Sequence, residues 1–146
     1  MKYFIYFLFL LLFSCDEKNN GDLPSSEGIP DQESWGVTII MTHDGLMRAE
    51  VKSGHLKKYN EQEYIVLDSS VVVDFFDLQE RHTSTLFSEK AEINEKSNDM
   101  LAIGNVIAKS DSGITLFSET LTWTAEDEKL FTKDSIMITT FDKDTL

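Results

Sequence analysis

Cysteine, proline and basic residues are all scarce in this sequence. One cysteine, at position 15, occurs in 146 residues, so no intramolecular disulfide can staple a folded domain. Both prolines, Pro24 and Pro30, lie before residue 35, within a polar segment. Thirteen basic residues face 26 acidic ones, and the formal net charge of −13 argues against nucleic acid as a partner.

Long hydrophobic runs are also missing, apart from one at the N-terminus. Lys2 is followed by eleven apolar residues, Tyr3 to Phe13, whereas a membrane-spanning helix needs about twenty. The chain turns polar directly after Ser14 and Cys15, which is typical of a lipoprotein signal peptide. Leu12-Phe13-Ser14-Cys15 resembles the lipobox of bacterial lipoproteins, which implies that Cys15 is acylated and becomes the first mature residue. The alternative is an uncleaved short anchor with an incidental cysteine, and in both cases the body of the protein is exported and tethered.

Composition divides the chain into three segments. Residues 1–14 form the predicted signal peptide, and residues 15–34 form a flexible linker rich in Gly, Ser, Asn and acids, beginning at the lipidated Cys15. Residues 35–146 remain, about 110 residues, which is enough for one domain with a modest core.

Motifs for chemistry are absent. The three histidines, His43, His55 and His82, are isolated in sequence and lack the spacing of a zinc site. Neither a nucleophile elbow nor a glycine-rich phosphate loop occurs. The carboxylates from Glu126 to Glu128 lie in a predicted turn, where polar residues are expected for local reasons. We therefore expect no metal, no cofactor and no catalysis; an exported hydrolase that uses turn carboxylates is the least favoured alternative.

An internal repeat is the most informative positive feature. The segment Thr85–Glu89 returns letter for letter as Thr115–Glu119, and apolar residues stay in step at an offset of thirty, as at Ile93 and Trp123. A fainter copy lies upstream, offset by thirty-five to forty residues. A fixed period of this kind predicts about three structural repeats of 30–40 residues.

Each repeat has the character of β-strands. Short runs of β-branched and aromatic residues are cut by turn-forming clusters, and no stretch sustains a helical period. The predicted strands are Ser34–Thr42, Leu46–Ser53, Leu56–Tyr59, Tyr64–Asp68, Val71–Asp77, Thr83–Ser88, Ala91–Glu95, Met100–Ile103, Val106–Lys109, Ile114–Ser118, Thr120–Thr124, Lys129–Thr132 and Ile136–Phe141.

Alternation along these strands predicts one apolar and one polar face. Counting every second residue places two matched sets on the apolar face, Phe87, Ala91, Ile93 and Leu101 in one repeat and Phe117, Leu121, Trp123 and Phe131 in the next. Thr120, Thr122 and Thr124 fall on the opposite face. Two apolar faces buried against each other give an all-β fold, a twisted antiparallel β-jelly roll or sandwich built from hairpins.

Several segments resemble the LptC family of lipopolysaccharide-export proteins and its LptA and OstA-type relatives. They are Gly45-Leu46-Met47-Arg48-Ala49-Glu50, then Lys58-Tyr59, then Val71-Val72-Val73, within a similarity from Trp35 to Leu146. The resemblance implies a non-enzymatic jelly roll on the periplasmic side of the inner membrane. It also implies that lipopolysaccharide arrives from an inner-membrane ABC transporter and passes to an LptA-like protein joined by edge-strand pairing.

Two features depart from this family. Many relatives carry a transmembrane helix where this chain has Cys15, and the chain stops at Leu146, before the further strands expected at the carboxyl edge. An alternative function is a surface-exposed or outer-membrane lipoprotein that binds another ligand through its outer face.

The predicted lipid-binding residues are the apolar ones expected to line the interior. Their contacts with acyl chains would be nondirectional, so a lipid could move along them. For each residue an ordinary filled core is an equally good explanation. The set is Phe87, Ile93, Leu101, Val106, Phe117, Leu121, Trp123, Phe131 and Ile136.

Overall fold

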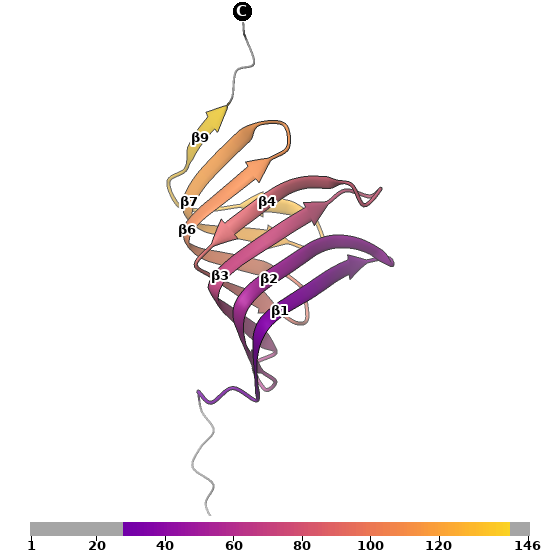
Figure 1. Ribbon diagram of the computed structural model, residues 1–146, viewed down its shortest axis with the longest axis vertical. Helices are drawn as coiled ribbons and strands as arrows, with labels where there is room; N and C mark the ends of the chain where they lie inside the picture. Colours follow the sequence, from indigo (N-terminus) through magenta and orange to yellow (C-terminus); the bar gives the residue numbers. More distant parts are fainter. Residues whose placement is uncertain (1–27, 141–146) are drawn as a thin grey trace, which may run out of the picture.

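The computed structural model describes residues 28–140, and this part of the chain contains nine strands and no helix (Figure 1). The strands are β1 (Gln32–His43), β2 (Leu46–Tyr59), β3 (Tyr64–Phe76), β4 (His82–Ser88), β5 (Lys90–Asn94), β6 (Met100–Ser110), β7 (Ile114–Thr124), β8 (Lys129–Phe131) and β9 (Met137–Thr140). The all-β prediction is confirmed.

All nine strands belong to one antiparallel sheet with a simple meander topology. The order along the sheet is β1-β2-β3-β4-β6-β7-β8, while β5 pairs with β3 and β6, and β9 pairs with β7. β4 and β5 are successive halves of one path across the sheet, interrupted at Glu89. β8 and β9 likewise both pair with β7, at its opposite ends.

A crease folds this sheet into two layers that face each other. The first layer contains β4 and β9, the second contains β5 and β8, and the five longer strands β1, β2, β3, β6 and β7 run through both. Pairing registers are interrupted or shifted where these strands cross the crease. Across the sheet, from β1 to β7, the crease passes through Gly36, Gly54, Ser69–Ser70, Glu89, Gly104–Asn105 and Glu119.

At three places along the crease, a serine side chain bonds to the backbone of the same strand path. The Oγ atoms of Ser53, Ser88 and Ser118 each donate a hydrogen bond to the carbonyl oxygen two residues later, at 2.9, 2.8 and 2.8 Å. Such local bonds replace ladder bonds where the backbone bends. Ser88 and Ser118 are the fourth letters of the two identical segments, so the exact sequence repeat marks the crease itself.

The two intervening strands bend by a different device. β3 uses Ser69 and Ser70, and β6 uses Gly104 and Asn105; all four have positive φ angles, from 46° to 82°. The carboxylate of Glu89 accepts a 2.6 Å hydrogen bond from the Asn105 side chain, and its backbone N–H donates to the Gly104 carbonyl at 3.1 Å. Left-handed backbone therefore alternates with serine bends along the crease.

The core fills the space between the layers near the crease. Val51, Val73 and Leu86 of the first layer and Leu67 and Leu121 of the second are at most 1% exposed. Around them pack the other buried apolar side chains, Met41, Ala49, Leu56, Val71, Phe75, Ala91, Ile93, Met100, Ala102, Val106 and Trp123. The centre of the described part is thus a packed interior.

The strand predictions are confirmed, whereas the face predictions fail at the crease for Phe87 and Phe117. They also fail after the hairpin turns for Leu101 and Phe131, which lie on the outer side of the second layer. Predicted segments on either side of a bend prove to be halves of single long strands in β2, β3, β6 and β7. Glu89 is one extra residue between Leu86 and Ala91, whose side chains are both buried. The alternation of inward and outward side chains therefore changes phase at Glu89. Phe87 consequently points outward and is 36% exposed, while its neighbour Leu86 is fully buried.

Some predictions concern residues outside the described range. The signal peptide of residues 1–14, the lipidation of Cys15, most of the linker and the end of the last predicted strand at Phe141 all lie there. β1 begins at Gln32, within the segment predicted as linker.

The crease predicts a large effect of a very small substitution. A Cβ atom on Gly54 would lie 2.6 Å from the carbonyl oxygen of Ser69, which is backbone and cannot swing away. We expect Gly54→Ala to lower the unfolding free energy by about 3 kcal/mol, at the upper end of overpacking effects. Gly36→Ala is the control: its Cβ meets nothing within 4 Å, and only its φ of 61° opposes alanine, at about 1 kcal/mol. The unfolding free energies of both variants are measured by urea denaturation. Equal decreases for Gly54→Ala and Gly36→Ala would contradict this account of the crease.

Candidate functional site

The candidate site lies at the mouth, which is the open end between the two layers, opposite the crease. Three adjoining pockets occur there, with volumes of about 300, 170 and 270 Å³. The first two share Met41 and Asn98, and the last two share Arg48 and Trp123. Together they form what we call the mouth groove.

Apolar side chains from both layers form about half of the groove lining, and polar or charged ones such as Thr42, Thr83 and Asn98 form the rest. Ile39 and Met41 of β1 and Phe75 of β3 come from the first layer, and Ile93 of β5 and Trp123 of β7 from the second. The rings of Phe75 and Trp123 meet across the gap between the layers, with centroids 5.6 Å apart and planes tilted by 46°. The groove thus continues the core outward to the solvent.

Arg48 lies in the middle of this apolar lining. Its side chain, on β2 of the first layer, is only 5% exposed and forms an ion pair through Nη2 with Glu128, in the turn between β7 and β8 of the second layer. Among the ion pairs of residues 28–140, this is the one that joins the layers across the mouth. Nε and Nη1 of Arg48 are buried and have no hydrogen-bond partner.

The nine residues predicted to bind lipid do not share one surface. Ile93, Val106, Leu121 and Trp123 are buried between the layers, and of these Ile93 and Trp123 reach the mouth groove. The prediction of a common interior is wrong for the others, which are Phe87, Leu101, Phe117, Phe131 and Ile136. Leu101 pairs with Thr122 and Thr122 with Phe131 on the outer side of the second layer, while Met100 and Trp123 take the inner side.

Sequence reasoning missed Arg48 and the aromatic pair. Arg48 was quoted only as part of a family-like segment, and Phe75 was not singled out. No local signal marks Arg48, because simple alternation with Ala49 and Val51 would place it on the polar face. The register shift between Met41 and Thr42 of β1 leaves Arg48 as an extra residue of β2, and its side chain is buried.

A comparison with protein-family models matches residues 8–141 to the model described as Lipopolysaccharide-assembly, LptC-related. The chain belongs to the LptC family. The resemblance drawn from the sequence is thereby confirmed, and it carries a role in lipopolysaccharide transport as the family's general function. A search of curated proteins finds no match.

Two further findings concern the described part of this LptC-family chain. Between residues 28 and 140, no helix is long and apolar enough to cross a membrane. In the same range, no three His, Cys, Asp or Glu side chains are grouped in a way that could hold a metal ion.

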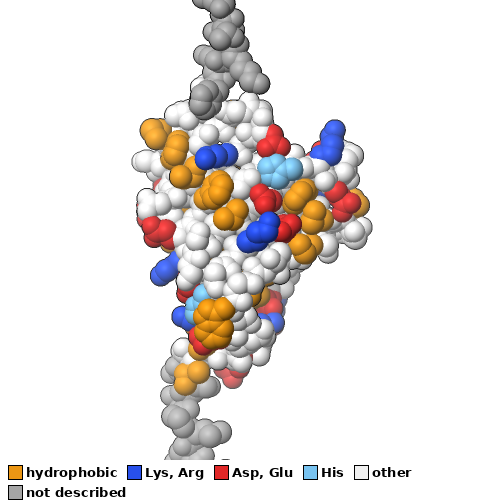
Figure 2. Space-filling model, in the orientation of Figure 1, with side chains coloured by type: hydrophobic (Ala, Val, Ile, Leu, Met, Phe, Trp, Pro, Cys, Tyr) orange, Lys and Arg blue, Asp and Glu red, His pale blue; other side chains and the backbone are white. Residues whose placement is uncertain are grey.

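The outer face of the first layer carries a second apolar region. Neighbouring strands place Val72, Phe87, Ile107, Phe117 and Met137 in one cross-strand row. Figure 2 shows hydrophobic side chains on this face among charged ones. A pocket of about 400 Å³ at one end of the row is lined by Phe117, Ile136 and Met137, so two predicted lipid-binding residues meet there, outside the interior.

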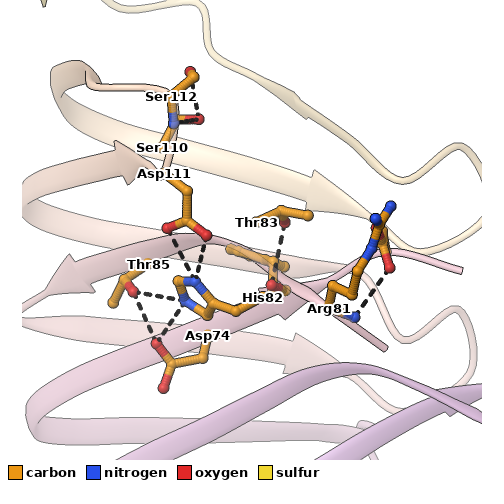
Figure 3. A network of polar contacts seen from close by, with 10 residues as sticks. Asp74, Arg81, His82, Thr83, Thr85, Ser110, Asp111 and Ser112 are labelled. Carbon is orange, nitrogen blue, oxygen red and sulfur yellow. Dashed lines mark hydrogen bonds and ion pairs between the residues drawn. The ribbon is translucent and has the colours of Figure 1, made fainter. Parts of the chain in front are cut away.

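A polar network crosses the strands beside this row (Figure 3). Nδ1 of His82 lies 2.9 Å from the Asp111 carboxylate, and Nε2 lies 3.0 Å from Thr85 Oγ1 and 3.4 Å from Asp74 Oδ1. The bond to Asp111 and, secondarily, the charge of Asp74 raise the pKa of His82 above its ordinary value of 6.5. The network therefore ties the turn after β6 to β3 and β4.

The raised pKa of His82 predicts a pH-dependent stability. Protonated His82 contributes its full stabilisation below about pH 6.5 and loses it as the pH rises through the folded-state pKa. We expect His82→Gln to be less stable than wild type at about pH 5.5, with the difference shrinking towards about pH 8.5. The effect should be small and sensitive to salt because both side chains are partly exposed.

Thermal unfolding at several pH values measures this difference. Asp111→Asn should lose the same pH-dependent part of the stability because it removes the main partner. A stability difference that stays constant between the two pH values would contradict the role given to His82.

Proposed function

We propose that this chain is a non-enzymatic, membrane-tethered component of lipopolysaccharide transport. It receives the lipid from an inner-membrane ABC transporter and passes it to an LptA-like periplasmic protein. The observation that carries the proposal is the mouth groove, which opens to solvent between two layers of one sheet and is lined by apolar side chains of both layers together with polar ones, in a chain of the LptC family.

The acyl chains would lie in the groove at the mouth and not in a slot through the core. Near the crease the core is packed, so the lipid is held at the mouth, against Met41, Ile93 and Trp123. Each methylene transferred from water onto this surface contributes about 0.8 kcal/mol. Such contacts have no preferred direction, so a chain slides along the groove without exchanging a fixed set of hydrogen bonds.

Edge strands supply the joints to the partners. β1 is at one end of the sheet order and β8 and β9 are at the other, and in Figure 1 the first and last strands lie far apart. Within the described residues β1 pairs with β2 alone, so its outer side carries backbone groups that another strand can bond by β-augmentation. Pairing at both edges would align the mouth grooves of successive proteins.

A second candidate function follows from the outer face. The apolar row from Val72 to Met137 is the kind of surface on which a surface-exposed or outer-membrane lipoprotein binds another ligand. It needs neither the mouth groove nor a transporter.

The two tryptophans of the chain form a matched pair of probe positions. Trp123 lines the mouth groove and is 5% exposed, whereas Trp35 is 70% exposed and stacks on His55 outside it. With p-benzoylphenylalanine at either position in cells, we expect a lipopolysaccharide adduct from position 123 and none from position 35. A probe at Met41 keeps the test valid if the change at position 123 disturbs folding.

Adducts at Phe117 instead of positions 123 and 41 would contradict the groove and favour the outer-face function. No adduct at any of the three positions in a folded, expressed protein would contradict lipid binding altogether.

The tether is tested separately from the lipid path. We expect Cys15→Ser to abolish incorporation of labelled palmitate and to leave residues 1–14 uncleaved, because acylation and cleavage both need the thiol. Ser14→Ala, which keeps a small residue before the cysteine, should still be labelled. Labelling of Cys15→Ser, measured by immunoprecipitation and gel mobility, would contradict lipidation at this position.

A further inference from the structure

Arg48 is a buried cation with spare hydrogen-bonding capacity. A guanidinium carries five N–H donors, and Glu128 contacts only the Nη2 end of Arg48. Nε and Nη1 have no partner. Each of them forms a fork suited to a carboxylate or a phosphate together with Nη2, so an anion that replaced Glu128 could accept two parallel hydrogen bonds. Burying a donor without a hydrogen-bond partner is unfavourable, so a ligand that accepts these bonds would stabilise the arrangement.

Within residues 28–140 no other group accepts a hydrogen bond from these donors. Of the other carboxylates at the groove, Asp77 is held by Arg81, with Nε to Oδ2 at 2.8 Å, and Glu95 is held by Lys58 at 2.6 Å. Glu126 is exposed on the same turn as Glu128. Arg48 is the buried arginine at the groove. A pocket lies on each side of it, and Trp123 lines both pockets.

Glu128 is held weakly by comparison. It lies in an exposed turn, with a positive φ of 54°, next to β8, which has three residues, all exposed. Residues 126–131 contribute no side chain to the buried core, whereas Arg48 is held in β2 among buried residues. Replacing Glu128 by another anion would open the mouth and expose Nε and Nη1.

We propose that Arg48 is the receptor for the phosphate headgroup of an amphiphile whose acyl chains lie in the mouth groove, and that Glu128 occupies this place when no lipid is bound. The proposal deepens the function proposed above and rests on it. Lipid entry then becomes an exchange of anions: the phosphate takes the guanidinium, the turn carrying Glu128 swings into solvent, and the layers separate at the mouth. Departure of the lipid restores the ion pair.

Trp123 provides the readout. In a Trp35→Phe background it is the single tryptophan, and it lines both pockets that contain Arg48. The probes are lipid A with its phosphates, the same lipid after dephosphorylation, and inorganic phosphate, each titrated against the fluorescence of Trp123. We expect the phosphorylated lipid to bind at least about tenfold more tightly than the dephosphorylated one, as two charge-assisted hydrogen bonds allow.

Three variants test the assignment in this background. Arg48→Met keeps the length of the side chain and should bind both lipids alike, at the level of the dephosphorylated form. Glu128→Gln removes the competing charge and should bind the phosphorylated lipid several-fold more tightly. Arg81→Met, at the only other arginine, changes the net charge equally and should keep the preference because that side chain is exposed.

The outcomes separate this inference from the function on which it rests. Equal binding of both lipids by wild type, or an undiminished preference in Arg48→Met, overturns the phosphate site and leaves lipid transport standing. Binding of neither lipid overturns both. Inorganic phosphate bound by Glu128→Gln as tightly as the lipid also overturns the lipid assignment, because the site would then take free anions. If Arg48→Met does not fold, unchanged affinity in Glu128→Gln decides against the exchange.

Discussion

The structure depends on one geometric constraint, which is that all strand paths bend at the same line. A sheet can fold into two layers only if the interruption in each strand lies beside the interruption in its neighbours. Serine-to-carbonyl bonds and left-handed residue pairs meet this demand alternately. At Gly54 the backbone of Ser69 leaves no room for a side chain. Everything functional, including the core, the mouth and the position of Arg48, follows from where the crease lies.

The crease also decides how much of the fold was predictable. Strand positions were predicted well because β-branched runs and turn clusters are local signals. The faces were not, because a single inserted residue at Glu89 or Glu119 reverses the alternation, and nothing in a count of every second residue reveals it. Phe87 and Phe117 were therefore placed inside, whereas Leu86 is the residue that is buried there. The identical segments around Ser88 and Ser118 contained the missing information, as a signature of the bend.

The candidate site was less predictable than the fold. Trp123 and Ile93 were named correctly as interior residues because both follow the bend and belong to strands of regular alternation. Arg48 could not be recognised, because its burial depends on Glu128, eighty residues further along the chain, and on the second layer covering it. Long-range pairing of this kind has no signal in local composition. The apolar pattern predicts a surface for acyl chains. In the proposed site, Arg48 at the mouth recognises the phosphate headgroup of the same lipid.

The meander has a consequence for how the molecule is assembled in time. Each path across the sheet pairs only with the path before it and the path after it. A chain that emerges N-terminus first can therefore close each hairpin as soon as the following dozen or so residues appear, without waiting for a distant segment, and such local pairing shortens the search during folding. At each stage the last strand formed has one unpaired side, which pairs with the next segment of the chain. Under the proposed edge pairing, association with a partner would repeat, between molecules, the step by which the sheet of residues 28–140 is built.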